Sequence, residues 1–417
     1  MSQSQYNNFD VIVVGGGASG MMAAGRAAEL GKKVLLLEKN KELANKLKIT
    51  GGGRCNITNA EYDIRALLKN YGAAEQFLYS SFSQFGVKET FTYFEERGLP
   101  LVIQARKRAF PHTEKALDVF KVLEKELVKN NVTIKLGATV SKVLKEEGKI
   151  SGIQVGRDVY TATSYILATG GASHPETGST GDGFGWLGNL GHKVKAPTPT
   201  IVPIKVSDTW AKALSGVAIN SMKITFYVDG VKKFTKTGKI LFTHFGLSGP
   251  LILNSAGKVG DLLQEGLVTA KIDLYPDLDD AKLEKKILKV FDENKNKMLK
   301  NIFAELVPPG TAAVILSLLK DPEVQNTKVH SVSRDARRNI LVTLRTLPLS
   351  ITGLMGFERA VVADGGVDLA EIDTKTMRSK KYDNLFITGD LLHINRPSGG
   401  FSLQLCWTTG HVAGSHA

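Results

Sequence analysis

The segment FDVIVVGGGASGMMAAGRAAELGKKVLLLEKN, residues 9–40, constrains the fold more than any other part of the chain. It begins with a β-branched run, residues 11–14, of the kind that parallel sheets bury. Small and apolar residues that suit a tightly packed helix follow at 21–30, and a second apolar run occupies 34–37. The order of strand, tight turn, helix and strand predicts an α/β fold with a Rossmann-like sheet.

The tight turn in this segment has the composition of a dinucleotide site. Its glycines stand in the pattern G-x-G-x-x-G at Gly15, Gly17 and Gly20. The free amides of the following helix, with Ala18 and Ser19 in its first turn, suit a pyrophosphate. The second strand ends at Glu38, followed by Lys39, at the spacing of a carboxylate that binds an adenosine ribose. An acidic residue there argues against a 2′-phosphate on this nucleotide.

Two distant strands indicate that the dinucleotide is FAD and not NAD. Short turns follow these strands, and they consist of Ala168, Thr169, Gly170 and Gly171 in the first and Gly389 and Asp390 in the second. In flavoproteins of the two-dinucleotide-binding-domain type, the turn after the first of these strands lies near the dinucleotide. The acidic residue after the second strand lies by the ribityl chain or pyrophosphate. An NAD site needs no such C-terminal acidic strand.

Length and charge narrow the class of protein further. A chain of 417 residues is expected to form two or three domains. Its formal charge of +13 fits solvated lysine-rich helices, an anionic cofactor or substrate, or a nucleic-acid partner. No aromatic-basic stacking motif or zinc signature gives firm support to nucleic acid, and no metal site is indicated.

Cysteine usage and the first residues bear on the compartment. Cys55 and Cys406 are the two cysteines, which excludes a disulfide framework and a neighbouring dithiol centre. The opening sequence MSQSQYNNFD has neither the pattern of a signal peptide nor that of a membrane span. A cytoplasmic protein without a membrane partner is therefore expected.

Further blocks spread along the chain carry a family resemblance. They are TGGGRCNITN (50–59), RAFPHTEKALDV (108–119), ATGGASHPETGSTGDG (168–183), LGHKV (190–194) with PTPTIVPI (197–204), LFTHFGLSGP (241–250), GGVDLAEIDTKTMRSK (365–380) and GDLLHINRPSGGFSLQLCWTTGHVAG (389–414). Jointly they resemble the BaiN/RdsA-like NAD(P)/FAD-dependent oxidoreductases, formerly labelled aminoacetone-oxidase-like or conserved flavoproteins. The resemblance extends over essentially the whole chain.

Two departures from the family pattern fall in the last block. The family commonly has Glu-Val-Leu-Asp where this chain has Asp-Leu-Leu-His at 390–393. It also has Gly-Gly-Tyr-Asn-Leu-Gln where Gly-Gly-Phe-Ser-Leu-Gln stands at 399–404. Both segments are implied to border the flavin, so cofactor binding is expected to persist while side-chain roles in chemistry differ.

The resemblance implies an FAD domain, an inserted β-barrel-like domain and a small helical domain. The expected bounds are 1–194 with 355–417 for the FAD domain, 195–276 with 340–354 for the barrel, and 277–339 for the helices. Local patterns agree, because MKITFYVDGVKKFTKTGKILFT alternates like paired strands around a hairpin turn at Asp229 and Gly230. Residues 278–320 carry helical spacing.

The glycine triplet in KLKITGGGRCNITN, residues 46–59, follows the Glu38 strand closely enough to continue the FAD cradle toward the isoalloxazine. The predicted cofactor contacts here are Thr50, Gly51, Gly52, Gly53, Arg54, Cys55 and Asn56. Glycine lacks a Cβ where backbone would meet cofactor. Arg54 could face pyrophosphate, flavin or an anionic substrate. For Cys55 a small packing thiol is favoured over a redox role, and Asn56 could equally be a turn residue.

The segment PSGGFSLQLCWTTG predicts a C-terminal helix whose N-terminus points at the flavin. Its predicted cofactor contacts are Gly400, Phe401, Ser402 and Leu403, and Val140 is assigned to the cofactor as well. The helix dipole would stabilise negative charge at flavin N1 and C2=O by about 0.3–1 kcal/mol when exposed. An ordinary packing helix is the alternative.

Candidates for catalysis are the basic side chains Arg54, Arg108, His174 and His393. His112 and His244 also lie in family-like blocks. None of these patterns identifies a dedicated proton donor.

The leading functional prediction is an FAD-dependent oxidoreductase that takes electrons from NAD(P)H and passes hydride from flavin N5 to a small organic acceptor. An activated C=C bond is the acceptor that the resemblance implies. We expect no second G-x-G-x-x-G motif in the chain, so NAD(P)H would be a transient co-substrate. The alternatives are an oxygen-using amine oxidase or dehydrogenase, and an RNA-associated or sensory flavoprotein. The sequence does not indicate an oligomeric state.

Overall fold

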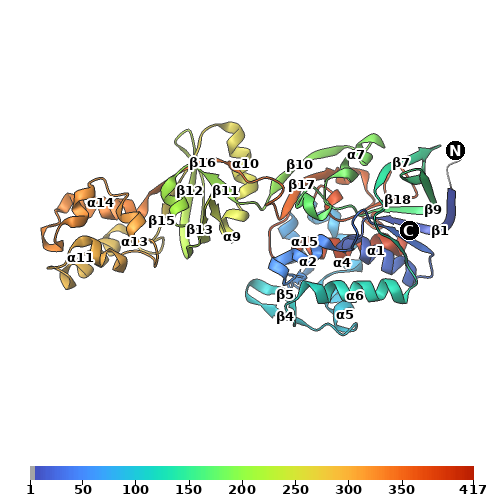
Figure 1. The fold of residues 1–417 in the computed structure, drawn as a ribbon, viewed down its shortest axis with the longest axis horizontal. Helices are drawn as coiled ribbons and strands as arrows, with labels where there is room; N and C mark the ends of the chain where they lie inside the picture. The colour runs from blue at the N-terminus through green and yellow to red at the C-terminus, as the bar shows by residue number, and fades with distance from the viewer. Residues whose placement is uncertain (1–4) are drawn as a thin grey trace. The chain divides into compact units, whose positions relative to one another are not determined.

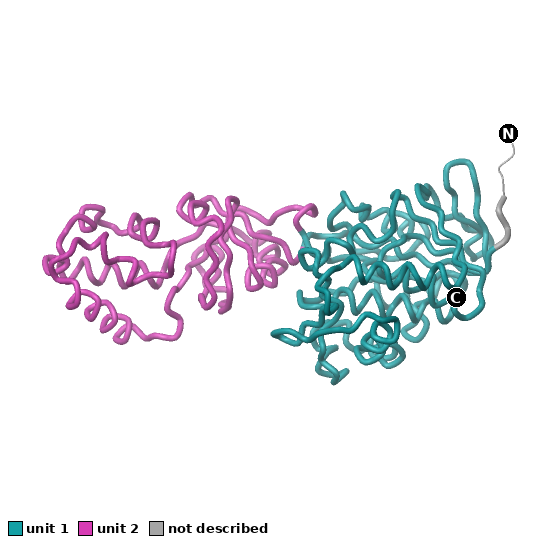
Figure 2. The backbone as a smooth tube through the Cα atoms, turned by 60° about the horizontal axis from the view of Figure 1, so that its bottom comes forward, with its two compact units in different colours: residues 1–199, 360–417 teal, residues 200–359 magenta. Residues whose placement is uncertain are grey.

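The computed structural model describes residues 5–417. The chain forms two compact units, one of residues 1–199 with 360–417 and one of residues 200–359 (Figures 1 and 2). The first unit is therefore discontinuous, and the second is inserted into it. The division of the inserted part into separate barrel and helical domains stays a prediction.

The first unit is built on a seven-stranded sheet with the order β6-β2-β1-β9-β8-β7, to which β18 adds beside β9. The strands are β1 (Gln5–Val14), β2 (Val34–Leu37), β6 (Thr133–Lys135), β7 (Val140–Glu146), β8 (Lys149–Val155), β9 (Asp158–Leu167) and β18 (Leu385–Ile387). The pairs formed by β1, β2, β6, β9 and β18 are parallel, whereas β7, β8 and the start of β9 form antiparallel hairpins. The predicted Rossmann-like α/β fold is confirmed.

Four parallel strands end in register, and this places their following turns side by side. Val14 pairs with Leu37 of β2 and with Leu167 of β9, and Leu167 pairs with Ile387 of β18. Ligands of open α/β sheets bind at this carboxyl edge. The turns that follow β1, β2, β9 and β18 therefore meet around one site.

Two helices cover the sheet next to this site. Helix α1 (Ala18–Glu29) packs against α15 (Phe401–His416) (Figure 1). Glycines of α15 allow the contact, because a Cβ at Gly410 would lie 2.4 Å from the Ser19 carbonyl oxygen and a Cβ at Gly414 would lie 2.3 Å from the Ala23 carbonyl oxygen. Close packing therefore fixes α15 on α1 without intervening side chains.

A buried polar network anchors the start of α15 to a second layer. Gln404 donates to Thr90 Oγ1 at 2.9 Å and to Thr408 Oγ1 at 3.1 Å, and it accepts from Thr58 Oγ1 at 2.6 Å. Trp407 donates to the Ile57 carbonyl at 3.0 Å. Fully satisfied buried networks specify one arrangement of the elements that they join.

The rest of the first unit consists of short elements. Its strands are β3 (Thr58–Asn59), β4 (Leu101–Gln104) and β5 (Arg108–Pro111) in one small sheet and β10 (Val194–Thr200) and β17 (Val362–Val367) in another. Its helices are α2 (Asn45–Ile49), α3 (Ile64–Leu68), α4 (Glu75–Gln84), α5 (Val87–Glu95), α6 (Ala116–Lys129) and α7 (Asp182–Asn189). The expectation of no second G-x-G-x-x-G is wrong, because the pattern recurs at residues 183–188, but there it lies inside α7 and does not follow a strand.

The second unit contains a closed barrel with the order β11-β14-β13-β12-β15-β16. Its strands are β11 (Ile204–Val206), β12 (Ala218–Val228), β13 (Val231–Thr243), β14 (Gly246–Ser248), β15 (Val268–Asp273) and β16 (Leu347–Leu354). The predicted hairpin is confirmed, since β12 pairs with β13 across Asp229 and Gly230, which have φ of 49° and 79°. Positive φ at both positions is the requirement of a type I′ turn.

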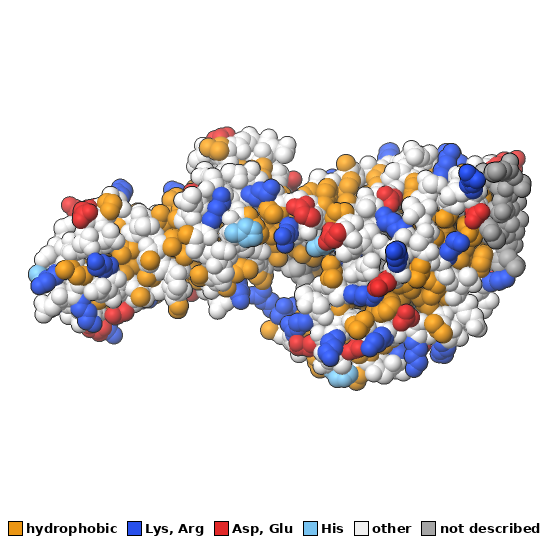
Figure 3. Space-filling model, in the orientation of Figure 1, with side chains coloured by type: hydrophobic (Ala, Val, Ile, Leu, Met, Phe, Trp, Pro, Cys, Tyr) orange, Lys and Arg blue, Asp and Glu red, His pale blue; other side chains and the backbone are white. Residues whose placement is uncertain are grey.

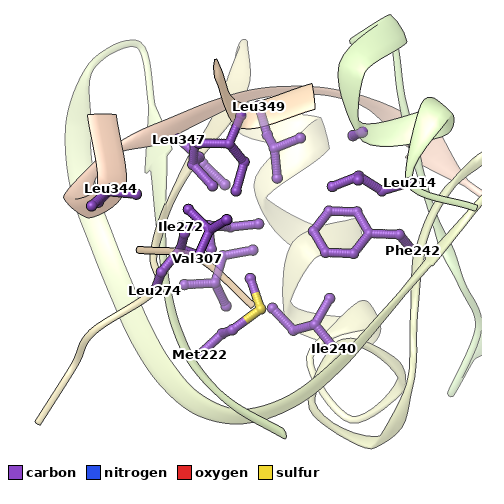
Figure 4. Close-up of a cluster of buried hydrophobic side chains, with 14 of the residues drawn as sticks. Leu214, Met222, Ile240, Phe242, Ile272, Leu274, Val307, Leu344, Leu347 and Leu349 are labelled. Atoms are coloured by element: carbon purple, nitrogen blue, oxygen red, sulfur yellow. The ribbon is translucent and has the colours of Figure 1, made fainter. Parts of the chain in front are cut away.

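Helices of the second unit share the barrel's hydrophobic core. They are α8 (Thr209–Ala213), α9 (Pro250–Leu253), α10 (Ala256–Glu265), α11 (Asp280–Glu293), α12 (Leu299–Ile302), α13 (Ala312–Leu316) and α14 (Arg334–Arg345). Figure 4 shows Leu344 of α14 and Val307 in the same buried cluster as the barrel residues Met222, Ile272 and Leu347. One continuous core thus joins the barrel and the helical segment.

Candidate functional site: a dinucleotide cavity at the sheet edge

A cavity opens at the carboxyl edge of the parallel strands in the first unit. Its wall is formed by the turns after β1, β2, β9 and β18, together with α2 and the first turn of α15. The predicted cofactor residues in this wall are Gly15, Gly17, Ala18, Ser19, Glu38, Thr50, Ala168, Thr169, Gly170, Gly389, Asp390, Ser402 and Leu403. Segments that lie far apart in the sequence therefore meet in one site.

The three motif glycines are needed for three different reasons. Gly15 has φ of +105°, and a Cβ there would lie 2.5 Å from the Ala168 carbonyl oxygen. A Cβ at Gly20 would lie 1.8 Å from the Gly15 carbonyl oxygen, so Gly20 permits the close packing of turn and helix. Gly17 lines the cavity, and a Cβ there would meet no protein atom within 4 Å. Gly17 therefore leaves room for a ligand, whereas Gly15 and Gly20 serve the protein's own packing.

Glu38 is held as a buried acceptor at one end of the cavity. Its carboxylate accepts from the amide of Gly16 at 2.7 Å and from the amide of Asn40 at 2.8 Å, and only 7% of the residue is exposed. Each carboxylate oxygen has room for a further hydrogen bond. Two ribose hydroxyls are donors of the required kind.

Two hydroxyl groups in the cavity wall lack partners of their own. Within residues 5–417, Ser19 Oγ and Thr169 Oγ1 are buried without a hydrogen bond. Each oxygen lies beside a glycine of a neighbouring helix, Gly410 for Ser19 and Gly183 for Thr169, so these hydroxyls do not by themselves indicate a ligand. Ser19 lies in the first turn of α1, where the helix dipole favours an anion. The residues that are present fit a pyrophosphate.

Lys39 and Val140 border a smaller cavity that shares Gly15, Glu38 and Thr169 with the main one. Lys39 bonds Asp182 at 2.7 Å and Thr180 at 2.5 Å. Both predicted residues therefore lie near Glu38 but outside the wall of the main cavity.

Asp390, Lys46 and Arg396 form a cluster of charge beside the cavity. Arg396 donates to Asp390 and, at 3.1 Å, to Ser402 Oγ, while Lys46 donates to Ser173 Oγ at 2.5 Å. Lys46 and Arg396 were not predicted from sequence. Their side chains reach Asp390 through tertiary packing of α2 and the loop before α15, which no local pattern in the sequence reveals.

The predicted helix start is confirmed at α15, but only part of it reaches the cavity. Ser402 and Leu403 line the wall. Gly400 has φ of +100° and is packed on the Thr58 backbone, where a Cβ would lie 2.3 Å from the Thr58 carbonyl carbon. Phe401 packs edge-on against Tyr71, with ring centroids 5.9 Å apart. Gly400 and Phe401 therefore shape the helix start and do not form the wall.

The glycine triplet forms a left-handed turn. Gly51, Gly52 and Gly53 have φ of 59°, 68° and 84°, a run that residues with a Cβ strongly disfavour. Of the predicted residues 50–56, Thr50 lines the main cavity and the triplet does not. The glycines are thus required by the backbone of the turn that carries Thr50, which is a different reason from the expected direct contact.

The structure also corrects the expectations for the side chains after the triplet. Arg54 forms a two-pronged ion pair with Glu114, at 2.7 and 2.9 Å, and lies over the Phe110 ring. Cys55 is fully buried, and burial raises the pKa of its thiol to about 12, so it stays protonated at neutral pH. Asn56, with its amide oriented by its hydrogen-bond partners, accepts from the Gly400 amide. None of the three lines the cavity, and neither does Gly171, which packs on Asp390.

We expect Gly52→Val to lose most of its bound flavin, because a β-branched residue at φ of 68° would distort the turn that holds Thr50. Flavin absorbance per protein would measure the loss, and circular dichroism would show whether the remaining fold is intact. Gly156→Val is the matched control, because Gly156 has φ of 59° in the β8–β9 turn and equally open surroundings. Normal flavin content in Gly52→Val would mean that the turn does not support the site.

The four candidates for catalysis are not brought together. Arg54 is paired as described, and Arg108 donates to the Ala105 carbonyl at 3.1 Å. His174 bonds Glu176 at 2.8 Å, and His393 lies 3.5 Å from Asp364. None of them lines the main cavity. Their catalytic assignment stays a prediction that the geometry does not support.

Fold and site together define a dinucleotide-binding protein of the Rossmann type, with its candidate site at the carboxyl edge of the sheet. The chain matches the HI0933-like protein Rossmann domain over residues 9–416. It therefore belongs to the HI0933-like family and is a flavin-dependent oxidoreductase with FAD as its cofactor.

Two curated relatives align with nearly the whole chain. The 3-dehydro-bile acid delta(4,6)-reductase of Clostridium scindens is 28% identical over 97% of this chain and 98% of its own. The ribosomal RNA dihydrouridine synthase of Haemophilus influenzae is 27% identical over 98% of both chains. Among solved structures, a 3-ketosteroid-delta4-(5alpha)-dehydrogenase from Rhodococcus jostii shares the fold, with a TM-score of 0.53 at 15% identity over 100% of this chain and 97% of its own.

Among residues 5–417, no helix has the length and apolar character that crossing a bilayer requires.

Proposed function

We propose that the chain is an NAD(P)H-dependent reductase of a small molecule whose carbon–carbon double bond is conjugated with a carbonyl group. Similarity over nearly the full length to two reductive relatives supports this proposal. A 3-dehydro steroid with a Δ4 double bond is an enone, and uridine carries its reducible double bond next to a carbonyl. The two named acceptors thus share one electrophilic group.

The protein's own residues would bind and orient the cofactor. Glu38 would accept from the ribose, and the amides of the first turn of α1 would donate to the pyrophosphate. Asp390 and Ser402, which line the same cavity, would border the ribityl chain and flavin. FAD supplies the two-electron chemistry, and the enzyme supplies position and electrostatics. The remaining G-x-G-x-x-G lies within α7, so a nicotinamide nucleotide would bind transiently and without a second Rossmann unit.

Uridine in RNA is a second candidate acceptor, favoured by the charge of +13 and by the name of the Haemophilus relative. Against it, basic and acidic side chains are interspersed on the face shown in Figure 3. Such a mixture of charges is usual for a solvated surface and does not by itself indicate a polyanionic partner. We therefore place the small enone first.

Anaerobic mixing of the purified yellow protein with NADH and with NADPH tests the electron donor. We expect rapid bleaching of the flavin absorption by at least one of the two. Absence of bleaching by both would contradict the proposal, and bleaching by amines alone would favour an amine oxidase. RNA that co-purifies and is released by salt would favour the RNA acceptor.

A further inference from the structure

The charge cluster formed by Asp390, Lys46 and Arg396 beside the cavity contains two cations and one carboxylate. Asp390 faces Arg396 on one carboxylate oxygen, and Lys46 Nζ lies 3.6 Å from the other. Burial alone would raise the pKa of Asp390, but the Arg396 guanidinium and the Lys46 ammonium outweigh it and hold that pKa below its ordinary value. Asp390 is therefore ionised, and two cations meet this buried carboxylate. Another carboxylate that interacts with Lys46, that of Glu176, is exposed and bonds His174.

The two cations have different surroundings. Arg396 is 3% exposed and is bound to Asp390, to Ser402 and to the Ile394 carbonyl. A buried arginine is costly unless it is paired, and Asp390 is its pair. Lys46 lines the cavity, and the uncharged Ser173 hydroxyl is its hydrogen-bond partner. The excess positive charge thus belongs to Lys46 and lies at the cavity wall.

The order of groups along FAD determines which of them meets this charge. Adenosine, pyrophosphate, ribityl chain and flavin follow one another in the cofactor. Lys46 is linked through Asp390 and Arg396 to Ser402 in the first turn of α15, and the N-terminus of this helix is expected to face the flavin. The first turn of α15 also lines the cavity and adds the positive end of a helix dipole.

We propose that Lys46 stabilises the reduced cofactor with its N1 position deprotonated, and that Arg396 is a positioning residue that neutralises Asp390. The inference rests on the proposed function only in taking FAD as the cofactor. Oxidised flavin that accepts two electrons takes up one proton, at N5, if N1 stays deprotonated, and two protons if N1 is protonated as well. A nearby cation lowers the pKa of an acidic group by about one unit or more.

The pH dependence of the flavin midpoint potential counts these protons. Dithionite titration with reference dyes across the neutral range measures it. Each proton per two electrons contributes about 30 mV per pH unit. The midpoint potential of the native protein is therefore expected to fall by about 30 mV, and not by about 59 mV, for each unit of rising pH. In the Lys46→Met variant, the pH at which proton uptake on reduction changes from two protons to one is expected to lie higher than in the native protein, by about one unit or more. Lys46→Arg keeps the charge and should restore the native slope.

Lys48→Met is the matched control, because Lys48 lies on the same helix but pairs with Glu42 at 2.8 Å and stands outside the cavity wall. A two-proton slope in the native protein would overturn the inference without any variant. Weaker FAD binding by Lys46→Met with an unchanged slope would place Lys46 at the pyrophosphate and overturn it too. Dithionite replaces NAD(P)H, and no organic acceptor is present, so failure of the proposed reaction would be detected separately.

Discussion

The Gly20→Ala variant is expected to lose FAD and to unfold at a lower denaturant concentration than the native protein. An added Cβ would lie 1.8 Å from the Gly15 carbonyl oxygen, so the turn and the start of α1 would have to separate. Such overpacking costs about 1–3 kcal/mol or more. Glycine-to-alanine changes inside helices usually stabilise by about 0.5–1 kcal/mol, so the expected sign is the reverse of the usual one. Denaturant titration of the FAD-free protein measures the effect.

Gly17→Ala separates the role of the ligand from the role of packing. Its Cβ would meet no protein atom within 4 Å, so the FAD-free protein should keep its stability while FAD binds more weakly. Gly188→Ala is the control, since Gly188 also has open surroundings but lies in α7, outside the cavity wall. Unchanged FAD affinity in Gly17→Ala would mean that no cofactor atom approaches this turn.

Glu38→Ala is the second change with a large expected effect. It would remove the ribose acceptor and leave the Gly16 amide, now bound at 2.7 Å, without its partner. Hydrogen bonds to charged groups contribute about 1.5–3 kcal/mol each, so FAD affinity should fall by roughly tenfold to a hundredfold. Fluorescence titration of the FAD-free protein with FAD measures the dissociation constant.

Glu42→Ala serves as its control, because Glu42 follows Glu38 closely in sequence but has an exposed side chain paired with Lys48. Its FAD affinity should equal that of the native protein. If Glu38→Ala purifies with full FAD content and native affinity, Glu38 does not bind the ribose.

Local sequence patterns were sufficient to predict which turns meet at the candidate site. The glycine motif, Glu38 and the late Asp390 each follow a strand, and the shared register of the strand ends brings them together. The hairpin at Asp229 and Gly230 was predictable for the same reason, since its turn chemistry is local. Each of these local patterns determines the backbone conformation of its own turn.

Side-chain partners from distant segments were not predictable. Arg54, which precedes β3, forms an ion pair with Glu114, which follows β5, and its side chain does not line the cavity. Lys46 and Arg396 gain their importance only because packing brings both to Asp390. The glycine triplet was singled out correctly as unusual, since its backbone is left-handed, and its direct contact with FAD stays a prediction.

Hydride delivery to a conjugated double bond is tested most directly by anaerobic reoxidation of the NAD(P)H-reduced protein. The acceptors would be 4-androstene-3,17-dione as a simple steroid enone and, separately, a uridine-containing RNA. We expect the yellow flavin absorption to return with the enone, together with a steroid product that has lost its conjugated double bond. Return of the absorption with RNA alone would favour the second acceptor. If neither acceptor restores it and only oxygen does, the protein is an oxidase and not a reductase of conjugated double bonds.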